Sequence, residues 1–224
     1  MQDQSATVAA VVPRVMDNYL TFWRTLAGCY DGAVEEADGL VMIATGLPIP
    51  FFNPAAILRW PADPVAVVER VRQFAGRHGC QSMLATWGEI ATRFEPVARQ
   101  LGLVDDGAAP EMILLPTDQR PLAALEGLTI EPVTTAAGQR AFADVVAGTY
   151  AMPRELASGF EAPALLTAPG IICYVGSVDG RPVATSMLLV TSDVAGVHVV
   201  GTLPEYRRRS IGAAMTQRCV DDGW

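Results

Sequence analysis

The sequence predicts a mixed α/β fold of the α+β kind, with one mixed sheet in each half of the chain. Short apolar runs alternate with longer segments of helical periodicity. Asp38-Gly39 and Asp179-Gly180 are hairpin signals, each between two strand candidates. Both halves contain three consecutive strand candidates followed by a helix. Because half of the 224 residues are hydrophobic, the chain can bury one large core or two small ones.

The first half begins with a helix on which Val12, Met16 and Trp23 recur at helical spacing, and Gly28 ends it. A second helix starts at the N-cap Asp63 and closes at Gly79. A third helix covers residues 89–101 and is expected to bend or restart at Pro96. The strand candidates of this half are residues 33–37, 40–45, 55–60, 81–86 and 111–115.

The second half starts after the polar, turn-like segment 117–121, so the predicted domains are residues 1–121 and 122–224. Its helices are expected at 134–150 and 210–222, with one or two short ones within 152–166. Its strand candidates are residues 128–132, 171–178, 183–190 and 194–203.

The shared order of elements suggests a structural duplication in which the second copy stops early, after its third strand and the following helix. A sheet that stops there has an open edge, which is a liability for a soluble protein. We therefore expect that the natural product is longer than this chain, or that a partner element completes the sheet. A homodimer is left open as one such arrangement.

Composition excludes several classes of function. The net charge of −8 disfavours a general nucleic-acid binder, which needs a basic face. The N-terminus lacks the basic start of a signal peptide, and no apolar run approaches the ~20 residues that cross a bilayer. Four scattered cysteines and two histidines show no metal-ligand spacing. We expect a cytoplasmic protein with free thiols, no metal and no membrane or nucleic-acid partner.

The most informative segment is residues 197–214. An apolar, β-branched run stops at Pro204, three arginines follow at 207–209, and small residues then open a helix. A strand that enters a helix through a tight basic turn suits an anionic ligand, because the free N–H groups and the positive end of the helix dipole lie together.

This segment resembles the acetyl-CoA-binding motif of the GNAT family of N-acetyltransferases, written (Gln/Arg)-x-x-Gly-x-(Gly/Ala). Arg207 matches the first position and Gly212 the last, whereas Ser210 stands at the first glycine and lacks its freedom for positive φ. With the hairpin 171–190, the resemblance covers about residues 128–224. Residues 1–116 resemble a degenerate half of a tandem GNAT protein.

The resemblance implies transfer of an acetyl group from acetyl-CoA to a primary amine of a small-molecule acceptor. The backbone N–H at about Leu203 would donate to the thioester carbonyl, and the pyrophosphate would lie on the N–H groups of residues 208–213. The implied cofactor-binding residues are Thr202, Leu203, Arg207, Arg208, Arg209, Ser210, Ile211, Gly212 and Ala213.

His198 is the candidate catalytic base, since histidine is the side chain most easily poised near neutral pH. Strand alternation places it on one face with Val200 and Thr202. The alternative is a histidine at a polar rim or satisfied in the core. The tyrosine that the family uses as general acid would lie beyond Trp224, and the position of Tyr206 on the outer side of the loop does not suit that role.

Two other functions compete with the acetyltransferase. A non-catalytic acyl-CoA-binding or regulatory protein could keep the fold without turnover, and an interaction scaffold would bind no CoA. The sequence lacks the glycine patterns of Rossmann, P-loop and Gly-x-Ser-x-Gly hydrolase sites. Phe51 and Phe52, in the loop 46–53, either line an acceptor pocket or pack a connector.

Overall fold

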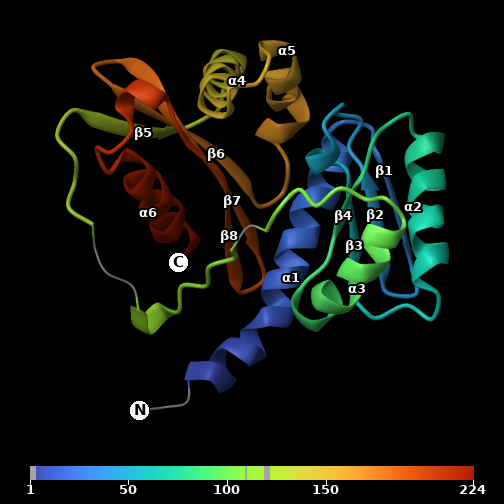
Figure 1. Cartoon of the computed structure of the whole chain (residues 1–224). Coiled ribbons are helices and arrows are strands. Elements are labelled where there is room, and N and C mark those ends of the chain that lie inside the picture. The colour runs from blue at the N-terminus through green and yellow to red at the C-terminus, as the bar shows by residue number, and fades with distance from the viewer. Residues whose placement is uncertain (1–3, 109, 119–121) are drawn as a thin grey trace. The chain divides into compact units, whose positions relative to one another are not determined.

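The structure is a computed structural model that describes residues 4–108, 110–118 and 122–224 (Figure 1). Its contacts divide the chain into two compact units. One is Trp23–Met112, and the other joins Met1–Phe22 to Ile113–Trp224. The division falls inside helix α1, Gln4–Cys29, so the first part of this helix packs with the C-terminal sheet. The units therefore do not coincide with the predicted ranges 1–121 and 122–224, which stay a prediction about family domains.

The unit Trp23–Met112 contains a four-stranded sheet in the order β1-β2-β3-β4. Its strands are Ala33–Ala37, Leu40–Ala44, Pro54–Ile57 and Met83–Ala85. The first three are antiparallel, and β4 runs parallel to β3. The predicted hairpin is confirmed at Asp38 and Gly39, whose φ angles of 56° and 81° suit the tight turn that joins β1 to β2.

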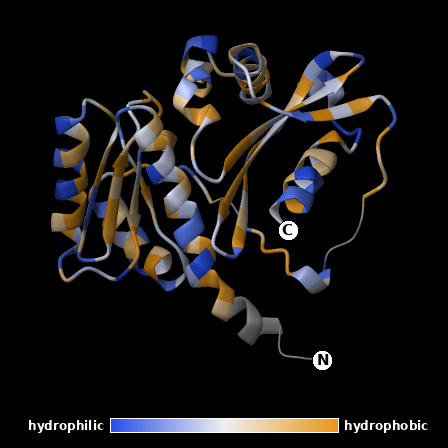
Figure 2. Cartoon of the chain, turned by 180° about the vertical axis from the view of Figure 1, so that it is seen from behind, coloured by the Kyte–Doolittle hydropathy of each residue, from blue (hydrophilic) through white to orange (hydrophobic). Residues whose placement is uncertain are grey.

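Helices α2, Pro64–Arg77, and α3, Gly88–Gln100, pack on this sheet through Phe74 and Phe94. The strands are largely hydrophobic, whereas the helices alternate polar and apolar residues, as Figure 2 shows. One prediction is narrowed here, and another was wrong. Helix α3 continues through Pro96, so the restart that was one of the two expectations there does not occur, and the bend stays a prediction. Residues 111–115 form no strand, because their β-prone side chains find no strand to pair with in the described structure.

The C-terminal unit contains a second sheet in the order β5-β6-β7-β8, antiparallel throughout. These strands are Leu128–Pro132, Ile171–Val178, Arg181–Thr191 and Val194–Thr202. Helix α4, Ala136–Tyr150, packs on β7 and β8, and short helical turns occupy Arg154–Leu166, including α5, Arg154–Ala157. Helix α6, Ile211–Gly223, packs on the sheet through Ile211, Met215 and Cys219, as its spacing predicts.

Candidate functional site

The predicted strand–turn–helix arrangement is confirmed at the end of β8. The strand ends at Thr202, a short helical turn spans Pro204–Tyr206, and α6 begins at Ile211. Pro204 ends the ladder because it has no N–H to donate. Residues 207–210 are exposed, so the turn is open to a ligand.

The backbone of the turn is left-handed at two residues, Arg208 with φ 61° and Ser210 with φ 58°. Turns that alternate in this way can direct successive N–H groups to one side, which is the backbone arrangement of anion-binding concavities. The Ser210 side chain accepts no capping hydrogen bond, so the helix start is not closed by its own residue. The expected loss of positive φ was wrong: Ser210 adopts it, at a strain on the order of 1 kcal/mol relative to glycine.

Arg207 holds the turn together from within. Its Nε donates to the Thr202 carbonyl at 3.1 Å, and a terminal nitrogen donates to the Thr149 carbonyl at 2.8 Å. These bonds connect the turn to the end of β8 and to the last residues of α4. The guanidinium is thus engaged by protein carbonyls, which makes Arg207 a positioning residue.

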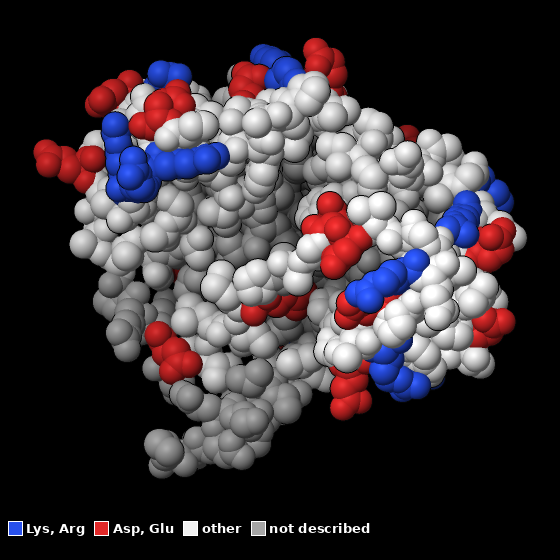
Figure 3. All heavy atoms as spheres, in the orientation of Figure 1, with Lys and Arg blue, Asp and Glu red and all other residues white. Residues whose placement is uncertain are grey.

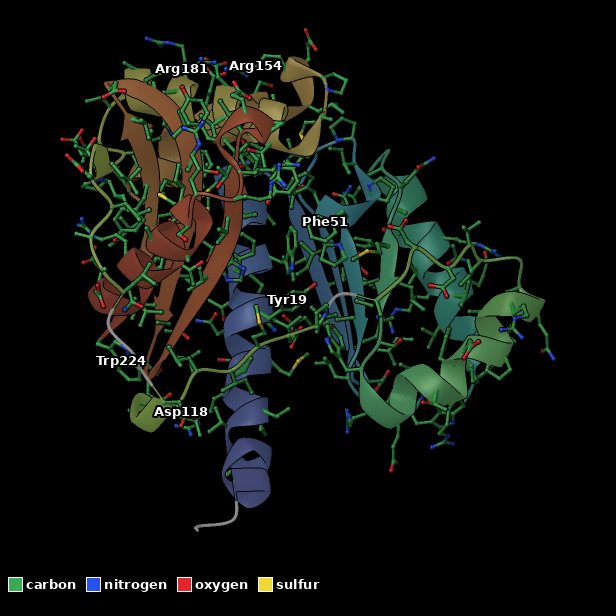
Figure 4. All side chains as sticks on the ribbon, turned by 60° about the vertical axis from the view of Figure 1, so that its left-hand side comes forward. Tyr19, Phe51, Asp118, Arg154, Arg181 and Trp224 are labelled. Atoms are coloured by element: carbon green, nitrogen blue, oxygen red, sulfur yellow. The ribbon has the colours of Figure 1, made fainter. Side chains whose placement is uncertain are left out.

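A second basic group lies beside the turn, around Tyr206. The guanidinium carbons of Arg181 and Arg209 lie 5.6 and 5.2 Å from the ring centre of Tyr206. Arg181 also pairs with Glu205 at 3.1 Å. Figure 4 labels Arg181 at the end of the sheet where β7 begins, and basic side chains gather with acidic ones at the upper left of Figure 3. The turn therefore carries positive charge on a chain whose net charge is −8.

The first residues of α6 divide into core and surface. The Ile211 side chain is buried among core residues, so only its backbone can face a ligand. Gly212 and Ala213 leave the helix start narrow, and a Cβ added at Gly212 would lie 3.6 Å from Thr202 Oγ1, an ordinary contact. An alanine side chain would therefore fit at position 212, in agreement with the Gly/Ala alternative at the last position of the acetyl-CoA-binding motif.

Leu203 does not meet the expectation for its N–H group. This N–H donates to the Val183 carbonyl at 2.9 Å, because β7 and β8 remain paired up to this point. It is therefore not available to a thioester carbonyl in this conformation. The Leu203 side chain instead lines a pocket of about 290 Å³, together with Ala141, Asp144, Val145, Arg181 and Pro182.

His198 lies on the opposite face of β8 from Thr202, and this corrects the expected alternation. The strand carries a bulge in which Val199 and Val200 lie opposite the single residue Ser186. His198 pairs with Met187, whereas Thr202 pairs with Ala184, three residues away on β7. The extra residue thus shifts the alternation by one position.

The surroundings of His198 are apolar. Its ring stacks on Phe22 with 3.8 Å between ring centres and 9° between planes. Nε2 is buried and has no hydrogen-bond partner among the described residues. Burial lowers the pKa of His198 to about 4, so the imidazole is neutral at pH 7 and a weak base.

One polar cluster was not predicted from the sequence. The buried Tyr174 hydroxyl donates to Asp222, and Arg218 donates to the same carboxylate at 2.8 Å and to the Ile130 carbonyl at 3.2 Å. Burial, followed by the bond to Asp222, raises the pKa of Tyr174. Burial likewise raises the pKa of Cys219 to about 11, so this thiol stays protonated. The i,i+4 spacing of Arg218 and Asp222 was the available signal. The cluster joins α6 to β5 and β6 and serves structure.

The aromatic loop 46–53, in the unit Trp23–Met112, packs on Trp23 of α1. Phe51 and Phe52 contact Trp23 edge to face, with ring centres 5.4 and 6.0 Å away. The buried Asn53 amide donates to the carbonyls of Leu47, Ile49 and Gln81. These bonds support the packed-connector interpretation of this loop.

Across residues 4–108, 110–118 and 122–224 there is no group of three or more His, Cys, Asp or Glu side chains placed to hold a metal ion. Within the same residues, no helix is both long enough and apolar enough to cross a membrane.

Comparison with known proteins places the turn in a family domain. Residues 115–224 match the family described as an acetyltransferase (GNAT) domain. A search of the curated proteins finds no match. Among solved structures, a GCN5-related N-acetyltransferase from Kribbella flavida is similar with a TM-score of 0.64 and 22% identity, over 86% of this chain and 76% of that one. This likeness shows a shared fold.

Two further structures are similar over part of the chain. A ribosomal-protein-alanine N-acetyltransferase from Brucella melitensis has a TM-score of 0.36 and 17% identity, over 42% of this chain and 70% of that one. An aminoglycoside N-acetyltransferase in complex with CoA has a TM-score of 0.35 and 14% identity, over 43% of this chain and 68% of that one.

Proposed function

We propose that this chain transfers an acetyl group from acetyl-CoA to a primary amine of a small acceptor, with the cofactor held by the C-terminal unit. The observation that carries the proposal is the start of α6, which is uncapped, left-handed at Arg208 and Ser210, and flanked by arginines. It lies inside the segment that matches the acetyltransferase (GNAT) domain.

The residues of the turn have separate roles in this proposal. The N–H groups of residues 208–213 bind the pyrophosphate, assisted by the helix dipole. The exposed side chains of Arg208 and Arg209 add positive charge for the phosphates. Arg207 keeps the turn attached to α4 and β8. When bound, acetyl-CoA supplies a thioester that an amine can attack.

A non-catalytic acyl-CoA-binding protein is the second candidate, and two observations favour it. The Leu203 N–H is engaged by Val183, and His198 is buried, neutral and covered by Phe22. A catalytic chain therefore needs another proton acceptor, for which a water path to solvent suffices.

We further propose that the chain is of the tandem GNAT type. Strands β1–β3 are antiparallel and are followed by α2, and β6–β8 are antiparallel and are followed by α6. The parallel strand β4 follows α2 in the first copy. This repeated order supports two copies of one fold, of which the second carries the cofactor turn.

The test measures release of free CoA thiol from acetyl-CoA on addition of amines of graded charge and size. Acceptor-dependent thiol release that falls when Arg208 and Arg209 are both replaced by glutamate supports the enzyme. Binding of acetyl-CoA with no release for any amine would favour the second candidate, and absence of binding would overturn both.

A further inference from the structure

The hairpin β7–β8 is held by the first part of α1, which belongs to the same compact unit. Strand β8 is the last of its sheet and has no strand on its outer side among the described residues. Figure 4 shows α1 running beside this sheet, with Tyr19 labelled on it. The contacts come from Arg14, Asn18 and Phe22, which we call the α1 stripe.

The α1 stripe is spaced at i, i+4 and i+8, so its members share one face of the helix. Arg14 pairs with Asp193 at the tip of the hairpin. Asn18 Nδ2 donates to the carbonyls of Leu189 and Val194 at 3.1 and 3.2 Å and to Thr191 Oγ1 at 2.8 Å. Phe22 stacks on His198. The stripe thus follows the hairpin from its tip toward the bulge.

Gly196 makes the close approach of Asn18 possible. A Cβ at this position would lie 2.0 Å from Asn18 Oδ1 and 2.7 Å from His198 Nε2. Any side chain here would push both groups away. The glycine, the amide and the imidazole therefore form one fitted contact.

Directly beyond His198, the strand is strained. Val199 has φ 51°, a conformation that β-branched residues rarely adopt. Its carbonyl accepts from Thr185 Oγ1 at 3.1 Å, and the carbonyl of Val200 accepts from the Tyr150 hydroxyl at 3.1 Å. The bulge persists because hydrogen bonds from β7 and from α4 hold its two carbonyl groups.

The bulge decides where the cofactor turn lies. If Val199 relaxed into a regular strand, the residues after it would shift by one position along β7, about 3.3 Å, and would exchange faces. Thr202 would leave the face on which it meets Gly212, and the turn would move with it. A fixed His198 thus sets the register in which the bulge begins, and the bonds from Thr185 and Tyr150 carry that register on to the start of the turn.

We propose that Asn18 and Phe22 are positioning residues for the acetyl-CoA turn, which they set by holding His198 and the β8 bulge in place. The proposal rests on the proposed function for the identity of the ligand. It gives His198 a packing role in place of the role of base. The neutral state of the buried imidazole agrees with this assignment.

The test uses the full chain with Asn18→Leu and Phe22→Leu, and Val12→Ala as the matched control on an exposed position of α1. We expect both stripe variants to raise amide hydrogen exchange in residues 199–203 and to weaken acetyl-CoA binding in calorimetry by about tenfold, a 1.4 kcal/mol change. The control should change neither. Unaltered exchange and affinity in folded stripe variants would overturn the proposal.

A double variant separates loss of this contact from simple unfolding. Gly196→Ala should weaken acetyl-CoA binding, because the added Cβ displaces both Asn18 and His198. Combining it with Asn18→Leu should add little further loss, since both changes remove the same contact, and fully additive losses would contradict the fitted contact. His198→Ala removes the ring on which Phe22 stacks and should weaken acetyl-CoA binding as the stripe variants do; unchanged affinity with loss of the acidic limb of the pH profile of turnover would instead make His198 a base. The exchange readout still reports on the stripe if no acetyl transfer is found.

Discussion

Two strand–turn–helix segments, β3–α2 and β8–α6, have the same order of elements and differ at the helix start. In the first, the Asp63 side chain accepts from the N–H groups of Val65 and Ala66 at 2.9 and 3.0 Å, and Pro64 contributes no N–H. In the second, Ser210 makes no cap, and the turn before it is basic. A carboxylate at a helix start satisfies the donors that an anion would use.

A few local residues thus give one order of elements two different helix starts. The first is closed by its own carboxylate. The second has no side-chain cap and is preceded by exposed arginines, so its donors are open to the ligand that we propose. We therefore expect one acetyl-CoA per chain, bound at β8–α6.

The largest expected effect comes from closing the second turn. Ser210→Asp puts a carboxylate at the start of α6, and aspartate tolerates the left-handed conformation. Acetyl-CoA affinity in calorimetry should fall about a hundredfold, because like charges ~4 Å apart near a protein surface repel by up to ~4 kcal/mol before salt screening. Ser210→Asn introduces a neutral side chain of the same size as aspartate, and its affinity for acetyl-CoA should stay close to that of the wild type. Equal losses in the two variants would remove charge as the cause.

The strands before the two turns also differ, because β3 carries only apolar residues and β8 carries His198. The pKa of folded His198 is lowered to about 4, below its unfolded value, so its contribution to stability is present above pH 6.5 and is lost as the pH falls to about 4. His198→Phe should resist acid unfolding better than wild type, by on the order of 3 kcal/mol at pH 4. Urea unfolding at pH 4 and 7 measures this difference.

The exposed Val12 provides the control for the acid experiment. Val12→Ala changes no titratable side chain and should leave the difference in stability between pH 7 and pH 4 unchanged. A wild-type chain that loses no more stability than His198→Phe over this window would show that the imidazole is not buried as described.

Removing the Asp63 cap at the start of α2 should lower the stability of the fold without creating a second acetyl-CoA site. Asp63→Ala removes the cap of α2 and should lower the free energy of unfolding by about 1 kcal/mol. Asp63→Asn keeps a capping oxygen and should match wild type. Calorimetry with acetyl-CoA should still give one site for both variants. A second site in Asp63→Ala would mean that the cap alone blocks binding in the first unit.

The smallest effect concerns the strain of the second turn. Ser210→Gly should stabilise the fold by on the order of 0.5 kcal/mol, since glycine adopts φ 58° without a steric cost. Ser158→Gly is the control, because Ser158 has φ −61° and gains nothing from glycine. Thermal unfolding of the two variants should shift in opposite directions. A destabilised Ser210→Gly would contradict the strain at this position.

Local turn and capping chemistry made much of the fold predictable. The two Asp-Gly hairpins, the Asp63 cap and the spacing of Ile211, Met215 and Cys219 each depend on residues close in sequence, and each is confirmed. The bounds of the strand 128–132 also agree. At the site, the strand, the basic turn and the helix start were predictable for the same reason.

What could not be predicted depends on long-range partners. The bulge at Val199 arises from the register between β7 and β8, which no local pattern encodes. The partners of Arg207 and of the Leu203 N–H lie on other elements, at Thr149 and Val183. Residues 111–115 have the composition of a strand and find no strand to pair with among the residues that the structure describes. The packing of Asn18 against β7–β8 joins positions more than 170 residues apart.

The most direct test of the central claim is a calorimetric titration of the full chain with acetyl-CoA. We predict a single site whose affinity falls about a hundredfold in Ser210→Asp and is retained in Ser210→Asn and Asp63→Ala. No binding at millimolar acetyl-CoA, or binding that Ser210→Asp leaves unchanged, would contradict the assignment of the cofactor to the start of α6.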